Sequence, residues 1–388
     1  IAAVGYALGR ITIKGVSLGT AGVFIVAILF GCLFYDKLGA QTAGYTKNAL
    51  KIVENLGLIL FVTSVGFIAG PKFFGNLKRN FKSYILLGLI IIFVGGLAAV
   101  GCLYIGRAIG TEDSKDLTAM ITGLLAGALT STPAFSAAKG SVDAAYEDTV
   151  SVGYGIAYIF GVIGVVLFVQ VLPKLLKANM EVERAKLTVV DENTKPRKES
   201  KHRLIDMDSF GIMPFACATL VGILVGMIKI PLTSAGLSGT CFSLTTTGGC
   251  LLTALVFGHF GRVGRVNVMP SASTLRVFRE FGLMLFLIGA GVSAGASFIE
   301  KFQPIYFLYG VVMTLLPMIV GFIFAKYVLK MHLLNILGSI TGGMTSTPAL
   351  GTLINIAGTE DVASAYAATY PMALIAVVLA SQFLIILF

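Results

Sequence analysis

The chain has 388 residues, of which 56% are hydrophobic and 12% are charged, and its mean hydropathy is +0.90. This balance excludes a water-soluble globular protein. The formal net charge of +10 does not indicate a nucleic-acid partner, because the basic residues lie in short loops between apolar runs, as they do in membrane proteins. We therefore expect the chain to lie in a lipid bilayer and to bind no nucleic acid.

Apolar runs of about 18 residues or more recur along the chain, and each can cross a bilayer as a helix. After a short first segment at 1–12, we expect apolar helices at 17–35, 56–72, 83–106, 118–138 and 151–172. A polar stretch follows, and the second series is expected at 210–229, 242–260, 281–299, 304–328, 333–357 and 363–388. The pattern predicts an all-α polytopic membrane protein with a first membrane repeat at 1–173, a cytoplasmic polar linker at 174–208 and a second membrane repeat at 209–388.

The two halves resemble each other in matched order. The sequence "NLGLILFVTSVGFIAGPKFF" at 55–74 resembles "EFGLMLFLIGAGVSAGASFI" at 280–299, and "GLLAGALTSTPAFSAA" at 123–138 resembles "GSITGGMTSTPALGTL" at 338–353. A two-fold repeat in a membrane protein suggests a transporter whose site lies between the halves. A duplication with a purely structural role is the alternative.

The basic residues indicate how the chain crosses the bilayer. If both TSTP segments, 130–133 and 345–348, are re-entrant hairpins, the basic linker lies on the cytoplasmic side, whereas spanning segments would place it outside. The positive-inside rule favours the hairpins. One loop is an exception, because 36–51 would lie outside although it carries three lysines and one aspartate. Each half then has about five transmembrane helices plus one hairpin. Because five is odd, the two repeats are inverted and both termini lie outside.

The TSTP segments suit a helix break. Non-helical backbone at membrane depth must be buried in protein or line a cavity. Thr132-Pro133 and Thr347-Pro348 are typical of helix starts, because proline fits the first helical position and threonine is a good N-cap. Gly127 and Gly342-Gly343 would ease the turns that precede these starts. A kink in an ordinary spanning helix is the alternative.

Two such helix starts would form an anion site. Helix N-termini carry free N–H groups and about half a positive charge, so two that meet near the membrane midplane would bind a carboxylate. Neighbouring hydroxyls add neutral donors, and no charge has to be buried. The predicted substrate-binding residues are Thr130, Ser131, Thr132, Pro133, Thr345, Ser346, Thr347 and Pro348.

Further candidates surround this set. Gly127 and Gly343 are included for their place beside the motifs, and Lys72 could pair with a substrate carboxylate, although a lysine at the end of a span is more often an interfacial anchor. Four arginines are interpreted as cytoplasmic-face charges, one of which could contact substrate. They are Arg262, Arg265, Arg276 and Arg279.

Acidic residues give little support for proton coupling. Glu54, Glu280 and Asp143 flank apolar runs and are expected to be solvated. With no clear acidic residue deep in a span, exchange without an obligate proton is the simpler interpretation.

Signals for an enzyme or a cofactor are not found in the sequence. The three histidines lie far apart without an HExxH pattern, and the five cysteines show no CxxC spacing. A GxxxxGK[ST] loop, which an ATP-driven pump would need, is not found either. We therefore expect a protein that is not an enzyme and holds no cofactor or metal.

Together these features resemble the aspartate:alanine exchanger family of bacterial secondary transporters. The resemblance rests on the paired GLxLF segments at 57–61 and 282–286, the paired TSTPA hairpins, and the "LPKLL…EVERAKL" exit at 172–187, and it covers essentially the whole chain. It implies an antiporter for small carboxylates, most readily aspartate against alanine, with succinate as the substrate of related members. It also implies a homodimer in the bacterial cytoplasmic (inner) membrane and an elevator-type movement of the hairpins.

The resemblance has one departure, in the linker. Members of the family usually carry a pair of TrkA-C-like soluble domains between the membrane halves, and here that region is only the polar stretch 174–208.

Two other functions stay open at this point. An ion channel or proton-coupled symporter could use the same inverted repeat, and an intramembrane enzyme would need a catalytic constellation that the sequence does not display.

Overall fold

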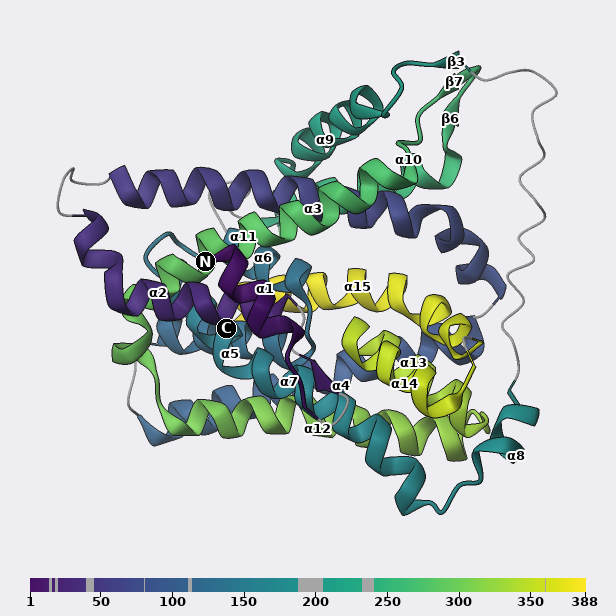
Figure 1. The fold of residues 1–388 in the computed structure, drawn as a ribbon. Helices are drawn as coiled ribbons and strands as arrows, with labels where there is room; N and C mark the ends of the chain where they lie inside the picture. Colours follow the sequence, from purple (N-terminus) through teal and green to yellow (C-terminus); the bar gives the residue numbers. More distant parts are fainter. Residues whose placement is uncertain are drawn as a thin grey trace. The chain divides into compact units, whose positions relative to one another are not determined.

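A computed structural model describes residues 1–13, 16–17, 20–39, 45–79, 81–110, 114–187, 205–231, 241–359 and 361–388. In these residues the chain is mainly helical (Figure 1). The elements up to the linker are α1 (Ala2–Arg10), β1 (Thr12–Ile13), β2 (Val16–Ser17), α2 (Ala21–Gly39), α3 (Tyr45–Arg79), the π-helix η1 (Phe81–Ile85), α4 (Leu86–Ile109), α5 (Ser114–Ala128), α6 (Thr132–Ser141), α7 (Glu147–Leu175) and α8 (Met180–Ala185).

The elements after the linker are again mainly helices joined by short strands. They are β3 (Ile205–Asp206), α9 (Ile212–Gly226), β4 (Lys229–Pro231), β5 (Cys241–Ser243), α10 (Thr245–Phe260), β6 (Arg262–Val263), β7 (Val266–Asn267), α11 (Ala272–Lys301), α12 (Pro304–Tyr327), α13 (Leu333–Gly343), α14 (Thr347–Ala357) and α15 (Val362–Leu387). The strands are two or three residues long. β1 pairs antiparallel with β2 and β4 with β5, while β7 pairs parallel with β3 and antiparallel with β6.

Six helices of the described chain are long and apolar enough to cross a membrane, which confirms a polytopic all-α membrane protein. They cover Tyr45–Pro71, Ser83–Ile109, Glu147–Leu175, Ala272–Lys301, Pro304–Tyr327 and Val362–Leu387. Two predicted spans are shorter than expected. α9 and α10 have 15 and 16 residues. At 1.5 Å per residue they reach about 23 Å, less than the thickness of a typical hydrocarbon core.

Two other predicted spans are not single helices. The segment at 118–138 is divided between α5 and α6, and the segment at 333–357 is divided between α13 and α14. Each break falls on the TSTP motif. The interpretation of TSTP as a kink in an ordinary spanning helix is therefore wrong, because the chain reverses at these points instead of bending.

The chain forms two compact units. The first comprises Ile1–Tyr35, Arg79–Glu192 and Gly291–Phe388, and the second comprises Asp36–Lys78 and Asn193–Ala290. α11 is divided between them at Gly291. Each unit draws on both halves of the sequence.

In the first unit, helices of the two sequence halves pack in an exchanged pattern. α5 packs on α7 and α13 packs on α15, so each half keeps this pair together. α6, however, packs on α15 of the other half, and α14 packs on α7. α4 and α12 also contact each other. The helices that carry the TSTP motifs therefore lie inside one bundle built from both halves.

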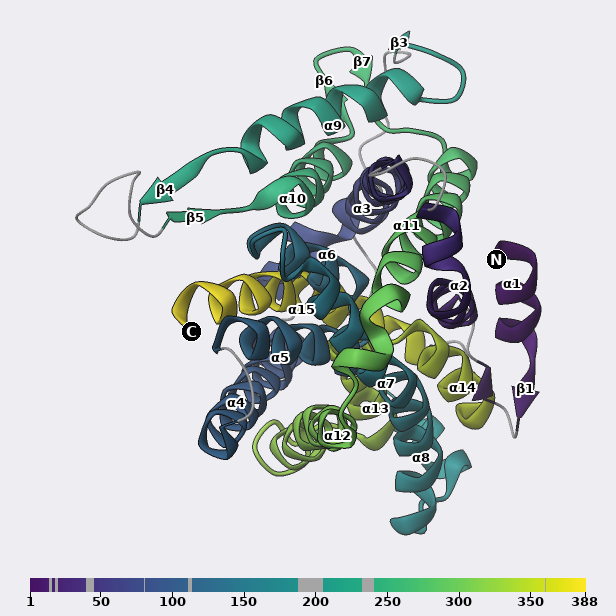
Figure 2. The same cartoon turned by 90° about the vertical axis from the view of Figure 1, so that its left-hand side faces the viewer.

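The second unit contains α3, α9, α10 and the first part of α11. α9 and α10 run side by side and are extended by the β4–β5 pair (Figure 2). α3 and α11 cross at Gly57 and Gly282, where a Cβ on Gly57 would lie 2.6 Å from the Gly282 carbonyl oxygen and the reverse distance is 2.7 Å. Only glycine permits so close a crossing. These two glycines begin the repeated GLxLF segments.

Candidate functional site

The two TSTP motifs form turns of the same geometry. At the end of α5, Thr130 has φ +52° and its N–H donates to the Gly127 carbonyl at 2.9 Å, while the Ser131 N–H donates to the Ala126 carbonyl at 2.9 Å. This pair of bonds around a left-handed residue is the Schellman motif that ends many helices. Its left-handed position is usually occupied by glycine, and here it is a threonine.

The second motif repeats each of these bonds. Thr345 also has φ +52°, its N–H donates to the Gly342 carbonyl at 3.1 Å, and the Ser346 N–H donates to the Thr341 carbonyl at 3.0 Å. The neighbouring glycines were expected to ease the turns, but none of them adopts a left-handed conformation. Gly127 and Gly343 lie inside α5 and α13, and the backbone turns at the two threonines instead.

The two turns bond directly to each other. The Thr130 hydroxyl donates to the Met344 carbonyl at 2.8 Å, and the Thr345 hydroxyl donates to the Leu129 carbonyl at 2.9 Å. Both bonds are buried, and each is the counterpart of the other in the second half of the chain. The hydroxyls thus join two segments that are more than 200 residues apart in the sequence.

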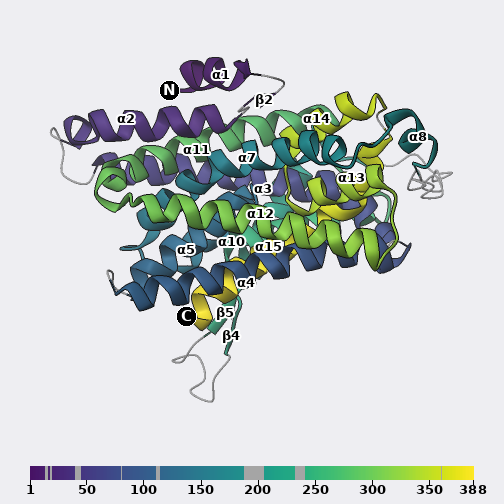
Figure 3. The same cartoon turned by 90° about the horizontal axis from the view of Figure 1, so that it is seen from below.

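The open ends of the two hairpins, where each first helix starts and each second helix ends, lie near opposite ends of α7. In the first hairpin, Lys115 at the start of α5 lies 3.6 Å from Asp143 beyond the end of α6, and Asp116 accepts a hydrogen bond of 2.6 Å from Thr149 in the first turn of α7. In the second, the start of α13 and the end of α14 pack around Val169, near the other end of α7. Figures 1 and 3 show α5 toward one end of α12, and α13 and α14 toward the other.

Both helices that leave the turns begin where the sequence predicts, but their N-caps are one residue earlier. α6 and α14 begin at Thr132 and Thr347, and the capping positions are Ser131 and Ser346. The left-handed turn directs the next residue into an extended conformation, so the serine is the last non-helical residue. Proline then takes the second helical position, where its missing N–H costs no intrahelical bond.

The two caps differ in their hydrogen bonds. Ser131 Oγ accepts the N–H of Ala134 at 3.3 Å. Ser346 Oγ is buried and has no hydrogen-bond partner among the described residues. A buried hydroxyl without a partner loses its hydration with no compensation. The start of α14 therefore presents a hydrogen-bonding group that no described residue uses.

A tyrosine contacts the first threonine of each helix. Thr132 Oγ1 lies 3.2 Å from Tyr154 Oη, and Thr347 Oγ1 lies 3.4 Å from Tyr366 Oη. Thr132 is buried and Thr347 is exposed. The first helix start is therefore enclosed by protein, whereas the second is open to its surroundings.

These tyrosines were not among the residues predicted from the sequence. They belong to a Tyr-x-x-x-Tyr pattern that occurs in the helix after each hairpin, at 154–158 and 366–370. The rings of each pair stack, with centroids 4.8 Å and 5.2 Å apart. The repeated spacing was the signal that could have revealed them.

Two buried charges were also missed. Lys139 in α6 is 4% exposed, and Glu54 in α3 is 5% exposed. The prediction that Glu54 is solvated is therefore wrong. α3 begins well before the predicted span, and Glu54 packs against α11, where an added Cβ on Gly289 would lie 2.7 Å from the Glu54 Cβ. Glu280 and Asp143 are solvated as predicted, at 47% and 75% side-chain exposure.

The remaining candidates are divided between the two units. Lys72 belongs to α3 in the second unit, and its side chain lies outside the described residues. Arg279 forms an ion pair of 2.6 Å with Glu280. Gly127 packs against α7, where an added Cβ would lie 2.5 Å from the Tyr154 carbonyl oxygen. Gly343 packs against Ile91 in the same close manner.

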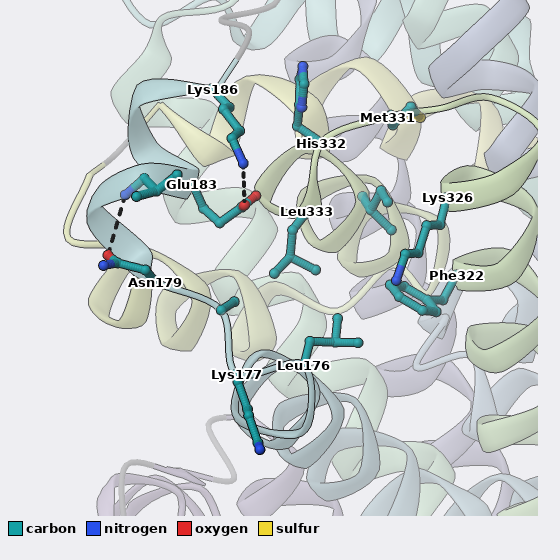
Figure 4. Close-up of a pocket in the computed structure, with 13 residues that line it drawn as sticks. Leu176, Lys177, Asn179, Glu183, Lys186, Phe322, Lys326, Met331, His332 and Leu333 are labelled. Atoms are coloured by element: carbon teal, nitrogen blue, oxygen red, sulfur yellow. Dashed lines mark hydrogen bonds and ion pairs between the residues drawn. The ribbon is translucent and has the colours of Figure 1, made fainter.

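A pocket of about 440 Å³ lies where α7, α8, α12 and α13 meet (Figure 4). Its lining is basic, with Lys177, Lys186, Lys326 and His332 against Glu183. The charges do not converge, since Lys186 forms an ion pair of 3.1 Å with Glu183 and the amino group of Lys177 points away from that pair. The pocket lies at the start of α13, a helix length away from the turn.

The membrane part of the chain matches a family of known proteins. A family model described as "Predicted Permease Membrane Region" matches residues 1–174 and 214–386. The unmatched interval contains the polar linker.

Three relatives share this likeness over nearly their whole length, and each carries the name uncharacterized transporter. One from Bacteroides thetaiotaomicron is 27% identical over 98% of this chain and 96% of its own. One from Desulfotalea psychrophila is 23% identical over 99% and 95%, and one from Rhodopirellula baltica is 24% identical over 99% and 98%. The first alignment runs over 538 positions, and 538 − 388 = 150, so that relative contains at least 150 positions without a counterpart here.

Proposed function

Because the chain belongs to the aspartate–alanine exchanger family, we propose that it is a secondary antiporter that exchanges small carboxylates, most readily aspartate for alanine. The family and the six apolar helices make it a multi-pass membrane transporter. The substrates and the exchange mode are our proposal. Exchange of dicarboxylates such as succinate is the nearest variant of it.

The observation that carries the proposal is the direct bonding of the two TSTP turns. Thr130 and Thr345 hold the turns together at 2.8 Å and 2.9 Å, so the starts of α6 and α14 lie close to one another. These helices have 10 and 11 residues, and each directs free N–H groups and a partial positive charge at its start. Such a pair attracts a carboxylate without a buried ion pair.

Neutral hydroxyls complete this proposed substrate site. Thr132 and Thr347 lie at the helix starts, and Ser346 has a buried Oγ without a partner in the described chain. A substrate carboxylate or ammonium group would satisfy that hydroxyl. We assign the eight residues of the two TSTP motifs to this site.

We further propose alternating access by an elevator-type movement of two inverted repeats. The open ends of the hairpins lie near opposite ends of α7, and each hairpin packs on a helix of the other sequence half. Both observations support an inverted pair. The enclosed Thr132 and the open Thr347 fit a state that is accessible from one side. The homodimer, the inner-membrane location and the outside position of both termini remain predictions of the family likeness and of the charge pattern.

A proton-coupled symporter is the second candidate, and the buried Glu54 favours it. An ionisable group inside a long apolar helix often marks an ion pathway. Uptake that follows a proton gradient, and that is lost in Glu54→Gln, would support it over exchange.

Counterflow in proteoliposomes tests the proposed function. Vesicles are loaded with unlabelled aspartate, alanine, succinate or no solute, and uptake of labelled aspartate is followed. We expect uptake that depends on internal aspartate or alanine. Uptake driven only by internal succinate would move the substrate to dicarboxylates, and uptake indifferent to the internal solute would contradict exchange.

A further inference from the structure

One face of α14 is polar and exposed along its length. Thr347, Gly351 and Asn355 follow one another at intervals of four residues, which places them on one side of the helix. All three are exposed, and an added Cβ on Gly351 would meet no other described part of the chain within 4 Å. Ala349 and Leu353, which lie between them in the sequence, are fully buried. We call the three exposed residues the polar face of α14.

The corresponding face of the first hairpin is enclosed. By the offset that relates the two motifs, 345 − 130 = 215, the counterparts of the polar face are Thr132, Ser136 and Gly140 in α6. They are also small or polar, but Thr132 and Ser136 are buried, and Gly140 at the outer end is exposed. The same pattern of residues therefore occurs twice, once covered by protein and once open.

The asparagine does not suit a helix surface that faces lipid. Asn355 is eight residues beyond Thr347, so it lies about 12 Å farther along the helix axis. That distance is less than half the thickness of a hydrocarbon core, which places Asn355 at membrane depth when the turns meet near the midplane. An amide that faced hydrocarbon there would lose its hydrogen bonds, and polar residues at this depth usually face protein or a water-filled cavity. The exposed polar face therefore indicates a surface that water reaches.

A cation lies at the outer end of this face. α14 is capped by Gly358, where an added Cβ would lie 3.1 Å from Arg184 Nη1. Arg184 belongs to α8, which contacts α14 (Figure 3), and its Nε donates to the Met180 carbonyl at 3.2 Å. Arg184 is exposed, while the adjacent Glu183 is paired with Lys186 at 3.1 Å. An anion that approaches the end of α14 therefore meets a hydrated positive charge.

We propose that the polar face of α14 is the route by which a small carboxylate reaches the start of the helix, and that Arg184 attracts the anion to this route. The inference rests on the proposed function and assigns residues to the approach to its site. Asn355 offers an amide donor, Gly351 leaves room for the substrate, and Thr347 lies at the site itself.

Cysteine labelling tests the route without any transport. Gly351→Cys and Asn355→Cys place a thiol on the polar face, Ser136→Cys is the matched control on the enclosed hairpin, and Ala349→Cys is the buried control on α14. The purified proteins in lipid nanodiscs are treated with a methanethiosulfonate reagent that carries a sulfonate, and modification is read from the mass of the peptide that contains the introduced cysteine. We expect both polar-face thiols to react about tenfold or more faster than the controls, because a hydrated thiolate is the reactive form.

The same labelling measures the preference for anions. A reagent that carries a trimethylammonium group is compared with the sulfonate reagent in Asn355→Cys, and each rate is divided by the rate of that reagent with free cysteine. We expect the sulfonate to be favoured about threefold, as for an anion near one exposed cation at low salt. Adding Arg184→Gln should abolish this preference, and Arg184→Lys should keep it. Aspartate, alanine or succinate should slow the modification of Gly351→Cys.

The outcomes separate this inference from the proposed function. Equal rates for Gly351→Cys and Ser136→Cys, or no reaction at Asn355→Cys, would overturn the route even if counterflow shows exchange. Reactive and substrate-protected polar-face thiols in a protein without exchange would support the route and contradict the antiporter. Failure of all three substrates to protect Gly351→Cys would overturn the assignment of the route to substrate. A charge preference that Arg184→Gln leaves unchanged would overturn the role of Arg184.

Discussion

Thr130 and Thr345 adopt a backbone conformation that β-branched residues usually avoid. Both have φ +52°, where glycine is the favoured residue and other side chains cost of order 1–2 kcal/mol. Glycine would serve the turn better, but it has no hydroxyl. Each threonine uses its hydroxyl to bond a carbonyl of the other turn. The cross-connection between the hairpins is therefore made at the cost of backbone strain at two matched residues.

We predict that Thr130→Val destabilises the protein more than Thr130→Gly. Valine keeps the strain and leaves the Met344 carbonyl without its buried partner, which costs about 1–3 kcal/mol. Glycine also loses the bond but relieves the strain. Thermal unfolding of the purified variants in detergent measures the order, with Thr130→Ser as the control that keeps the hydroxyl. A Thr130→Val protein as stable as wild type would contradict the account.

The sequence predicted the location of the helix starts but not the detail of the turns. Proline after threonine is a strong local signal, so α6 and α14 begin at the predicted residues. The N-caps were assigned one residue too late, and the left-handed threonines were not predicted, because this conformation is rare for threonine and is stabilised here by a bond to a distant carbonyl. Burial of Lys139 and Glu54 likewise depends on tertiary packing, which local patterns do not contain.

At the scale of elements, a compact polar cluster anchors the base of the first hairpin. Lys301 Nζ at the end of α11 lies 2.8 Å from Asp116 Oδ1 and 2.7 Å from Thr149 Oγ1, and the Thr149 hydroxyl donates to Asp116 at 2.6 Å. The ion pair is only about a quarter exposed, at 26% and 21%. It connects α11, α5 and α7 at one end of the first unit.

We predict that Lys301→Met lowers stability by about 1–3 kcal/mol, because it leaves a partly buried carboxylate without its cation. Lys115→Met is the matched control. The Lys115–Asp143 pair is 70% and 75% exposed, so its loss should change the unfolding temperature little. If both variants lose the same stability, the cluster around Asp116 has no special part in holding the hairpin.

Asp208 is a pH-dependent cap of α9. Its carboxylate accepts the N–H of Met213 at 2.8 Å and those of Ile212 and Phe210 at 2.9 Å, and these bonds, led by that of Met213, lower its pKa below the usual 3.8. A lowered pKa in the folded state means that the carboxylate stabilises the protein above its unfolded-state pKa. That contribution is lost as the pH falls through the folded-state value.

We therefore predict that Asp208→Ala lowers the unfolding temperature at pH 7 and that the difference from wild type shrinks as the pH falls below 3.8. Thermal unfolding of both proteins across this range is the measurement. A difference that stays constant with pH would show that the charge of Asp208 contributes nothing to the cap.

At the scale of the whole molecule, corresponding segments of the two sequence halves contact each other. Gly57 and Gly282 head the two GLxLF segments and contact each other where α3 crosses α11. Thr130 and Thr345 head the two TSTP motifs and bond across the hairpins. The sequence revealed which segments correspond. It did not reveal that each hairpin packs on a helix of the other half, because a repeat pattern carries no information on pairing between repeats.

The polar linker lies in the interval that the family model leaves unmatched. The unmatched interval of the family model lies between 174 and 214, and an aligned relative extends over at least 150 additional positions. The expectation that other members carry soluble domains between the membrane halves stays a prediction. The transport site we propose uses none of the linker residues, so we expect exchange to proceed in this chain without such domains.

The most direct test of the central claim is exchange by a protein altered only at one helix start. Thr347→Val removes the hydroxyl at the open start of α14 and keeps its shape. Thr352→Val changes the same helix five residues later, where the hydroxyl donates to the Pro348 carbonyl at 3.3 Å. In counterflow we predict that Thr347→Val loses most uptake of both aspartate and alanine and that Thr352→Val retains it. Wild-type exchange by folded Thr347→Val would contradict the assignment of the TSTP turns as the substrate site.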